Sequence, residues 1–119
     1  MSHVVVPGLL RQEGREYQQG EVIFERGAAA TCMYVVAEGE VDLAIGDTHL
    51  ETLRPADIFG ELALIASEPR SATARARTAC KLIEIPEARF TYLVKETPHF
   101  ALAVMRVLTA RLRRRDPVA

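Results

Sequence analysis

Short segments rich in β-branched and aromatic residues follow one another from residue 15 to residue 53, and glycines separate most of them. Regular spacing of this kind is typical of an antiparallel sandwich or roll. Within residues 40–45 apolar side chains alternate with polar or small ones, which predicts a strand with one face towards the core. The stretch predicts five strands, at residues 16–18, 22–25, 32–37, 40–45 and 48–53.

The run of strands is interrupted before it resumes. Pro55 and Asp57 favour a turn, and the apolar residues after Gly60 suggest a single turn of helix. Strands then resume at residues 71–77 and 80–85. An interruption of this kind is awkward in a plain sandwich, because it must be placed at the edge of a sheet. A binding pocket at that edge would explain it.

Residues 59–74 contain three groups suited to a small anion attached to a hydroxylated ring. Gly60 allows close approach of the backbone and frees the N–H groups of the following turn, which attract negative charge. Arg70, introduced by Pro69, offers a fork of donors that matches two oxygens of a phosphate. Ionised Glu61 can only accept hydrogen bonds, so beside a phosphate it suits a sugar hydroxyl of the same ligand.

The sequence Phe-Gly-Glu-Leu-Ala-Leu-Ile at 59–65, followed by Pro-Arg-Ser-Ala-Thr-Ala at 69–74, resembles the phosphate-binding cassette of cyclic nucleotide-binding domains. That family includes bacterial cyclic-AMP receptor transcription factors, regulatory subunits of cyclic-AMP-dependent kinase and cytoplasmic domains of cyclic-nucleotide-gated channels. The family pattern covers roughly residues 15 to 112. The resemblance implies a mainly β fold with C-terminal helices: an antiparallel β-roll (a jelly roll or double-stranded β-helix) with a short cassette helix and a helical lid.

The resemblance also implies roles for the cassette residues. Arg70 would hold the cyclic phosphate, and Glu61 would accept a hydrogen bond from the ribose 2′-hydroxyl. The Ser71 hydroxyl would contact the phosphate, and a serine here tilts the expectation slightly towards cyclic AMP over cyclic GMP, since threonine at this position is often linked to guanine. The remaining expected ligand contacts, several through backbone amides, are Gly60, Leu62 and Ala72.

Two features of the cassette are open to a purely structural explanation. Glu61 and Arg70 would pair with each other in a β-roll interaction module that has lost its ligand. Ala72, Ala74 and Ala76 alternate along the strand after the cassette, and their small side chains either leave room for a ligand or suit a tight bend of the roll.

After Pro86 the pattern becomes helical, with helices predicted at residues 86–95 and 98–115. The second carries an apolar stripe of six residues, expected to contact the roll, a second copy or the ligand: Phe100, Ala101, Val104, Met105, Leu108 and Leu112. Its final arginines suit a helix C-terminus exposed to water. Resemblance to channel-type members implies instead that Arg111, or Arg114 or Arg115 in its place, stacks on the nucleobase.

A metalloenzyme with a cupin-like roll is the other class considered. Such enzymes cluster histidines around a metal, whereas His3, His49 and His99 are scattered in this sequence. A hydrolase would need metal ligands or an activated nucleophile, and no such group is recognisable. We therefore expect no catalytic residue, no metal site and no cofactor.

Composition supports one globular domain at residues 15–119 after a lead-in at residues 1–14. The chain has 119 residues and a formal charge of −1, so bulk attraction to nucleic acid is not expected. No helix-turn-helix follows the last helix, which argues against sequence-specific DNA binding. With neither a leader nor a membrane span recognised, the expected location is the cytoplasm. Cys32 and Cys80 suit buried thiols better than a disulfide or metal site.

These observations together predict a non-catalytic sensor that binds a 3′,5′-cyclic purine nucleotide. Occupancy would be relayed through the C-terminal helix to a protein partner, a fused domain or a second copy. The second copy could form a homodimer through that helix.

Overall fold

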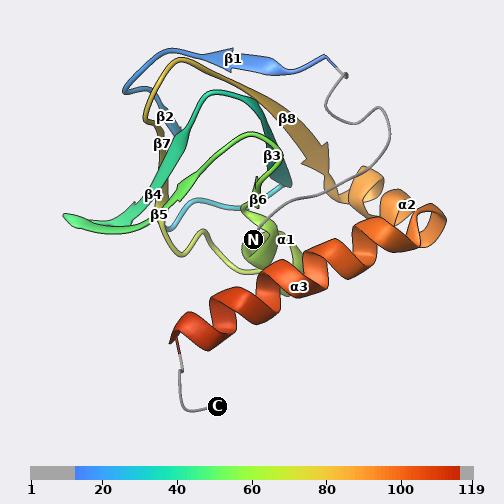
Figure 1. Cartoon of the computed structure of the whole chain (residues 1–119). Helices are drawn as coiled ribbons and strands as arrows, with labels where there is room; N and C mark the ends of the chain where they lie inside the picture. Colours follow the sequence, from blue (N-terminus) through green and yellow to red (C-terminus); the bar gives the residue numbers. More distant parts are fainter. Residues whose placement is uncertain (1–12, 116–119) are drawn as a thin grey trace.

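The computed structural model describes residues 13–115, except for the side chains of residues 114 and 115. Within these residues eight strands precede a helical C-terminal part, and a short helix lies between the sixth and seventh strands. Figure 1 shows how these elements are arranged. The elements are β1 (Arg15–Tyr17), β2 (Val22–Phe24), β3 (Cys32–Glu38), β4 (Val41–Ile45), β5 (Thr48–Leu53), β6 (Ile58–Phe59), α1 (Glu61–Ala66), β7 (Thr73–Ala76), β8 (Cys80–Pro86), α2 (Glu87–Glu96) and α3 (Pro98–Arg115).

The strands form two four-stranded sheets with the orders β1-β8-β3-β6 and β2-β7-β4-β5. Every pair of neighbouring strands is antiparallel. Because β3 and β4 are consecutive in the chain but belong to different sheets, the chain crosses between the sheets and closes a roll. The predicted antiparallel β-roll with a cassette helix and C-terminal helices is confirmed.

β6 is the one strand of the described residues that the sequence does not predict. It has only two residues, and it pairs with β3 at Tyr34 and Val35. Ile58 and Phe59 are fully buried on opposite faces of this short pairing, in the two different cores. A strand this short gives no periodic signal, so tertiary contacts determine it.

β7 begins two residues later than predicted, at Thr73. The backbone of Arg70 is bound instead to the connection between β2 and β3. Its N–H donates to the Ala28 carbonyl and its carbonyl accepts from the Gly27 N–H, both at 2.8 Å. These bonds hold the cassette arginine against the roll before the strand starts.

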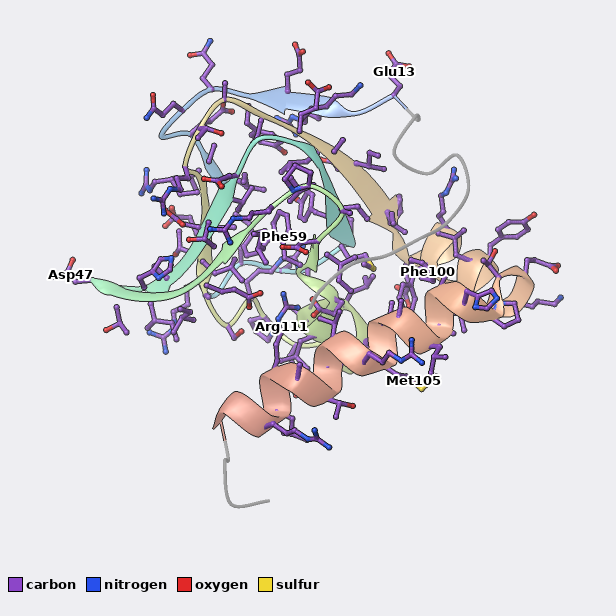
Figure 2. The ribbon with its side chains drawn as sticks, viewed as in Figure 1. Glu13, Asp47, Phe59, Phe100, Met105 and Arg111 are labelled. Atoms are coloured by element: carbon purple, nitrogen blue, oxygen red, sulfur yellow. The ribbon has the colours of Figure 1, made fainter. Side chains whose placement is uncertain are left out.

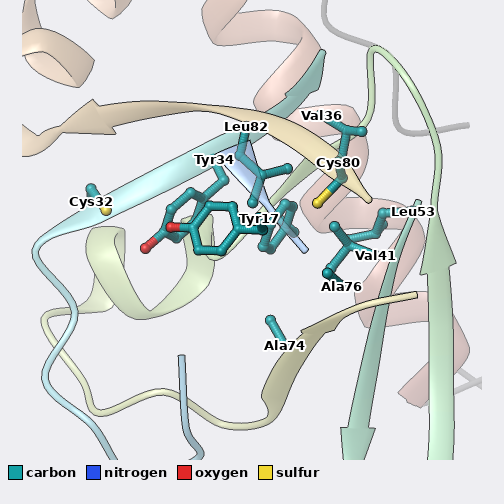
Figure 3. Packing of buried hydrophobic residues seen from close by; sticks show 11 residues of the cluster. Tyr17, Cys32, Tyr34, Val36, Val41, Leu53, Ala74, Ala76, Cys80 and Leu82 are labelled. Atoms are coloured by element: carbon teal, nitrogen blue, oxygen red, sulfur yellow. The ribbon is translucent and has the colours of Figure 1, made fainter. Parts of the chain in front are cut away.

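β3 is buried on both faces, which explains its nearly continuous apolar sequence. Cys32, Tyr34 and Val36 point into the roll, where Figure 3 shows the surrounding side chains. Met33 and Val35 point the other way, into a second core under the helices. Cys32 and Cys80 are free, buried thiols, as predicted.

α3 turns a different set of side chains inward than the predicted stripe. Phe100, Val104 and Val107 are almost completely buried in the second core. Met105 and Leu112 are 56% and 62% exposed, so these two residues of the predicted stripe are not buried against the roll, and contact with a second copy or a ligand stays a prediction for them. The buried residues follow i, i+4, i+7 spacing and so share one face of the helix. Met105 directly follows Val104 and therefore lies about 100° away from it around the helix. No helix among residues 13–115 is long and apolar enough to span a bilayer.

Candidate functional site

A cavity of about 530 Å³ opens between the cassette, the β4–β5 hairpin and the C-terminal half of α3. Its volume falls within the range typical of small-molecule sites. All seven predicted ligand-binding residues line it: Gly60, Glu61, Leu62, Arg70, Ser71, Ala72 and Arg111. Leu108 and Leu112 of the predicted apolar stripe also line it. The structure adds residues that the sequence analysis does not assign to the ligand: Phe24, Leu43, His49, Leu50, Glu51 and Ala63.

Arg70 is buried, with only 4% of its surface exposed, and its guanidinium is held rigidly. Nη1 donates to the Gly60 carbonyl at 2.7 Å and Nη2 donates to the Cys32 carbonyl at 2.6 Å. The guanidinium carbon lies 4.1 Å from the centre of the Phe24 ring, a cation–π distance. The local fold therefore fixes the position of this cation without any ligand.

The positive charge of Arg70 has no carboxylate partner within the described part of the chain. Its two hydrogen-bond acceptors are neutral carbonyls, and its Nε is buried without a hydrogen-bond partner. A buried, incompletely satisfied guanidinium is costly unless an anion completes it. The arrangement is therefore suited to an anionic ligand.

Gly60 is required at its position for two reasons. Its φ of 78° lies in the left-handed region, which strains most other residues. A Cβ atom there would also lie 2.7 Å from Nη1 of Arg70. The glycine thus permits both the start of α1 and the close approach of Arg70.

Glu61 pairs with Arg111 rather than with Arg70. Its side chain is 1% exposed, and Nη1 of Arg111 donates to Oε1 of Glu61. Arg111 also donates to the Ile58 carbonyl at 2.9 Å and, through Nε, to Glu51 Oε1 at 3.2 Å. The alternative in which Glu61 and Arg70 form an ion pair with each other is therefore wrong. Stacking of Arg111 on a nucleobase stays a prediction.

Arg111 fastens α3 to the roll by these contacts. Figure 2 shows it at the inner side of α3, near α1. Its partners come from β5, β6 and α1, and those on β5 and α1 line the cavity. Arg111 consequently links the helix to the cavity wall by polar contacts. The side chains of Arg114 and Arg115, the predicted substitutes, lie outside the described set.

The mouth of the cavity is apolar and partly open to solvent. Leu50, Leu62 and Leu112 line it and are 46%, 40% and 62% exposed. Leu108 adds a partly buried side chain from α3. Exposed leucines around a cavity with charged groups inside suit a ligand with a flat apolar part and a charged part.

The alternating alanines have different surroundings. Ala72 lines the cavity, whereas Ala74 and Ala76 are buried among the side chains inside the roll. The small side chain of Ala72 therefore leaves room for a ligand. The small side chains of Ala74 and Ala76 instead allow close packing inside the roll.

Glu51 is the charged cavity residue that the sequence analysis missed. A signal was present, because Glu51 and Leu53 are two apart on β5 and so share a face of the strand, and Leu53 is completely buried. The bulge near Leu43 and Ala44 in the pairing of β4 with β5 disturbs the alternation before Glu51. This irregularity cannot be read from the sequence.

His49 belongs to a polar group on the hairpin rather than to a cluster with other histidines. Its Nε2 lies 3.2 Å from Asp42 Oδ1, which also accepts from the Thr52 hydroxyl at 2.7 Å. Burial raises the pKa of Asp42, but the hydrogen bonds from Thr52 and His49 and the charge of Arg77 outweigh it and lower the pKa overall. Among the described residues, no three His, Cys, Asp or Glu side chains are grouped as metal ligands.

Comparison with known proteins identifies relatives of this arrangement. Residues 14–97 match the family model described as "Cyclic nucleotide-binding domain". The chain is 36% identical over 98 residues to a cyclic nucleotide-gated potassium channel of Rhizobium etli, covering 82% of this chain and 27% of the channel. The chain spans about a quarter of the length of this channel and of two further potassium channel relatives that it matches.

Solved structures share the fold. The catabolite activator protein of Thermus thermophilus has a TM-score of 0.79 and 31% identity, over 87% of this chain and 51% of that one. A structure described as "A cyclic-GMP-dependent signalling pathway regulates bacterial phytopathogenesis" has a TM-score of 0.80 and 33% identity, over 93% and 97% of the two chains.

Proposed function

Because the chain belongs to the cyclic nucleotide-binding domain family, we propose that it is a non-catalytic sensor whose cavity binds a 3′,5′-cyclic purine nucleotide. The observation that carries the proposal is Arg70: a buried, fixed cation that lines the cavity with an unpaired Nε and no carboxylate partner among the described residues. A cyclic phosphate is a diester with one negative charge, and its two exocyclic oxygens match the donors of a guanidinium. The Ser71 hydroxyl and the backbone amides of the cassette complete the phosphate contacts.

Glu61 accepts from the ribose 2′-hydroxyl in this proposal. The contact with Arg111 uses Oε1 of Glu61. A carboxylate has about four acceptor sites, so one oxygen can accept from Arg111 while the other accepts from the ribose. The apolar mouth formed by Leu50, Leu62 and Leu112 receives the purine.

α3 reports occupancy, since Leu108, Arg111 and Leu112 all line the cavity. A ligand shifts a conformational equilibrium only if it contacts the two conformations differently. A nucleotide that changes the contacts of Arg111 with Glu51 and Glu61 meets this condition, because those contacts fasten α3 to the roll. The response passes to a protein partner, a fused domain or a second copy that contacts α3.

Titration calorimetry of the full chain tests the proposal. Cyclic AMP and cyclic GMP should bind one per chain, and 5′-AMP, whose open phosphate carries a second charge and a different shape, should bind much more weakly. Ser71 favours cyclic AMP slightly between the two messengers. Failure of both cyclic nucleotides to bind would refute the sensor and favour the alternative of a β-roll interaction module that has lost its ligand.

A further inference from the structure

α3 carries a second set of apolar side chains, on the side away from the roll. Leu102, Met105 and Leu112 are 42%, 56% and 62% exposed. Figure 2 shows Met105 pointing away from the roll, whereas Phe100 points towards it. Single exposed apolar side chains are ordinary on a protein surface, so the arrangement of these three decides what they mean.

The exposed apolar residues are three and four positions apart, with one threonine among them. At about 100° per residue, Leu102, Met105 and Leu112 lie within about 80° of one another around the helix. Thr109 lies in the same arc and is exposed. Its hydroxyl donates to the Met105 carbonyl at 2.8 Å, so its polar group is satisfied within the helix. We call these four residues the outer stripe.

The outer stripe has the spacing of a coiled-coil seam. Leu102 and Thr109 occupy the a positions of two heptads, and Met105 and Leu112 occupy the d positions. A stripe confined to a and d is narrower than the apolar face of a helix that packs on a globular core or lies in a membrane surface. The pattern therefore favours a second helix as the occupant.

Arginines follow the outer stripe along one side. Arg106 and Arg113 directly follow the two d residues, at the e positions, within about 40° of Leu102 around the helix. Both are exposed, and neither forms an ion pair with a carboxylate in the described part of the chain. The segment Pro98–Arg115 contains no acidic residue. An occupant with carboxylates beside its apolar seam would complement this charge.

We infer that the outer stripe docks a partner helix with apolar a and d residues and acidic residues at its e or g positions. Contact along the seam supplies the buried area, and the charge pairs set the partner and its orientation. The inference names a partner for the proposed relay through α3. It rests on that proposal for what the contact does, not for whether the contact forms.

A second copy of the chain matches the outer stripe less well than an acidic helix. The e positions of a second α3 carry the same two arginines, and its g positions are Ala101 and Leu108. In antiparallel pairing arginine would face arginine, and in parallel pairing arginine would face an uncharged residue. A second α3 therefore offers no carboxylate to Arg106 or Arg113 in either orientation.

Leu112 connects the outer stripe with the cavity, because it belongs to the stripe and also lines the cavity. Leu108 and Arg111, on the same turn of α3, line the cavity as well. A partner helix that covers Leu112 would therefore contact the segment of α3 that the ligand contacts. The docking surface thus lies where occupancy of the cavity can be sensed.

Three synthetic helical peptides with leucine at every a and d position test the outer stripe on the unaltered full chain. They differ only at e and g, which are all glutamate, all glutamine or all lysine, and are used below the concentration of their own self-association. The glutamate peptide should bind most tightly and the lysine peptide about tenfold more weakly, with the glutamine peptide between them. Fluorescence anisotropy measures the affinities, and high salt should reduce the differences.

Reversal of the two charges on α3 gives the second test. Arg106→Glu combined with Arg113→Glu should reverse the order, so that the lysine peptide binds most tightly. Arg26→Glu combined with Arg89→Glu is the matched control, because these exposed arginines lie outside α3 and the net charge changes equally. The control should keep the order of the unaltered chain. Met105→Ser should weaken all three peptides by about tenfold, because apolar contact is lost.

Other occupants of the outer stripe would each give a different result and overturn the inference. A dimer of the unaltered chain in analytical ultracentrifugation, lost in Met105→Ser, would assign the stripe to a second copy. Binding to phosphatidylglycerol vesicles but to none of the peptides would assign it to a membrane surface. Equal affinity for the glutamate and lysine peptides, or no binding of either, would exclude the acidic helix.

The peptide titrations need no nucleotide, so their outcome is separate from that of the proposed function. A chain that binds cyclic nucleotides but no peptide keeps the sensor and loses this docking surface. A chain that binds the glutamate peptide most tightly but no cyclic nucleotide keeps the surface and refutes the sensor. Circular dichroism shows whether each variant folds, and the peptide series on the unaltered chain remains decisive if one does not.

Discussion

Arg70 and Arg111 line the same cavity, but different kinds of groups hold them. Arg70 is 4% exposed and donates to two neutral backbone carbonyls. The Arg111 side chain is 20% exposed, and its charge is matched by two carboxylates, Glu51 and Glu61. Carbonyls fix a cation without neutralising it, whereas carboxylates do both. The part of the cavity around Arg70 therefore has an uncompensated positive charge that suits an anion. Around Arg111 the charge is already compensated, so a ligand there must replace a carboxylate partner.

The largest effect is expected from Arg70→Ala. Loss of two charge-assisted contacts to phosphate should weaken cyclic nucleotide binding by at least about 100-fold. Calorimetry measures the change and circular dichroism checks the fold. Arg75→Ala is the matched control, because Arg75 also donates to a backbone carbonyl, that of Gly20, but lies outside the cavity lining. Equal affinities in Arg70→Ala and the unaltered chain would remove Arg70 from the phosphate site.

Substitution of Arg111, unlike that of Arg70, should mainly lower the free energy of unfolding. Arg111→Met leaves Glu61 buried without its cation, and removal of one partner of a buried pair costs about 3 kcal/mol. Denaturant unfolding of the ligand-free chain measures this change. The double variant Arg111→Met, Glu61→Gln should recover part of the loss, because the unpaired charge is gone. Additive losses in the double variant would show that the pair is not coupled.

Glu61→Gln should weaken binding of the ribonucleotide by about tenfold, the value of one hydrogen bond to a charged group. The 2′-deoxy analogue should be affected much less, since it lacks the hydroxyl that Glu61 accepts. Comparison of the two analogues removes any general effect of the altered pair with Arg111. Similar losses for both analogues would contradict the hydroxyl contact.

The smallest effect is expected from a substitution of Asp42, which lies on the β4–β5 hairpin and contacts neither Arg70 nor Arg111. Asp42 has a lowered pKa, so its ionised form stabilises the fold above its usual pKa, and this contribution disappears as the pH falls through the lower value of the folded state. Asp42→Asn should cost about 0.5 kcal/mol at neutral pH and nothing in strong acid. Denaturant unfolding at several pH values measures this. A loss that persists below the folded-state pKa would exclude the electrostatic explanation.

The sequence predicts the Arg70 end better than the Arg111 end for a physical reason. Gly60, Glu61, Arg70 and Ser71 lie close together in the chain, so their spacing carries the pattern of the site. Arg111 lies 50 residues beyond Glu61 and 60 beyond Glu51, and only the folded path of α3 brings them together. Resemblance to the family pointed to Arg111, but nothing local indicated which groups it contacts.

The same distinction applies to the fold. Strands and helices with a strong periodic pattern are predicted within a residue or two, including α3 over its full range. β6 depends on contacts with Tyr34 and Val35 of a distant strand. The inner face of α3 likewise depends on the path of β3 and β8 beneath it, so Val107 replaces Met105 in the core.

A crystal structure of the chain with a bound cyclic nucleotide tests the central claim most directly. The account predicts that an exocyclic phosphate oxygen accepts from the Arg70 guanidinium, that the buried Nε gains a partner, and that the bonds to the Gly60 and Cys32 carbonyls remain. A nucleotide bound with its phosphate elsewhere, and with Arg70 still held only by those carbonyls, would contradict it.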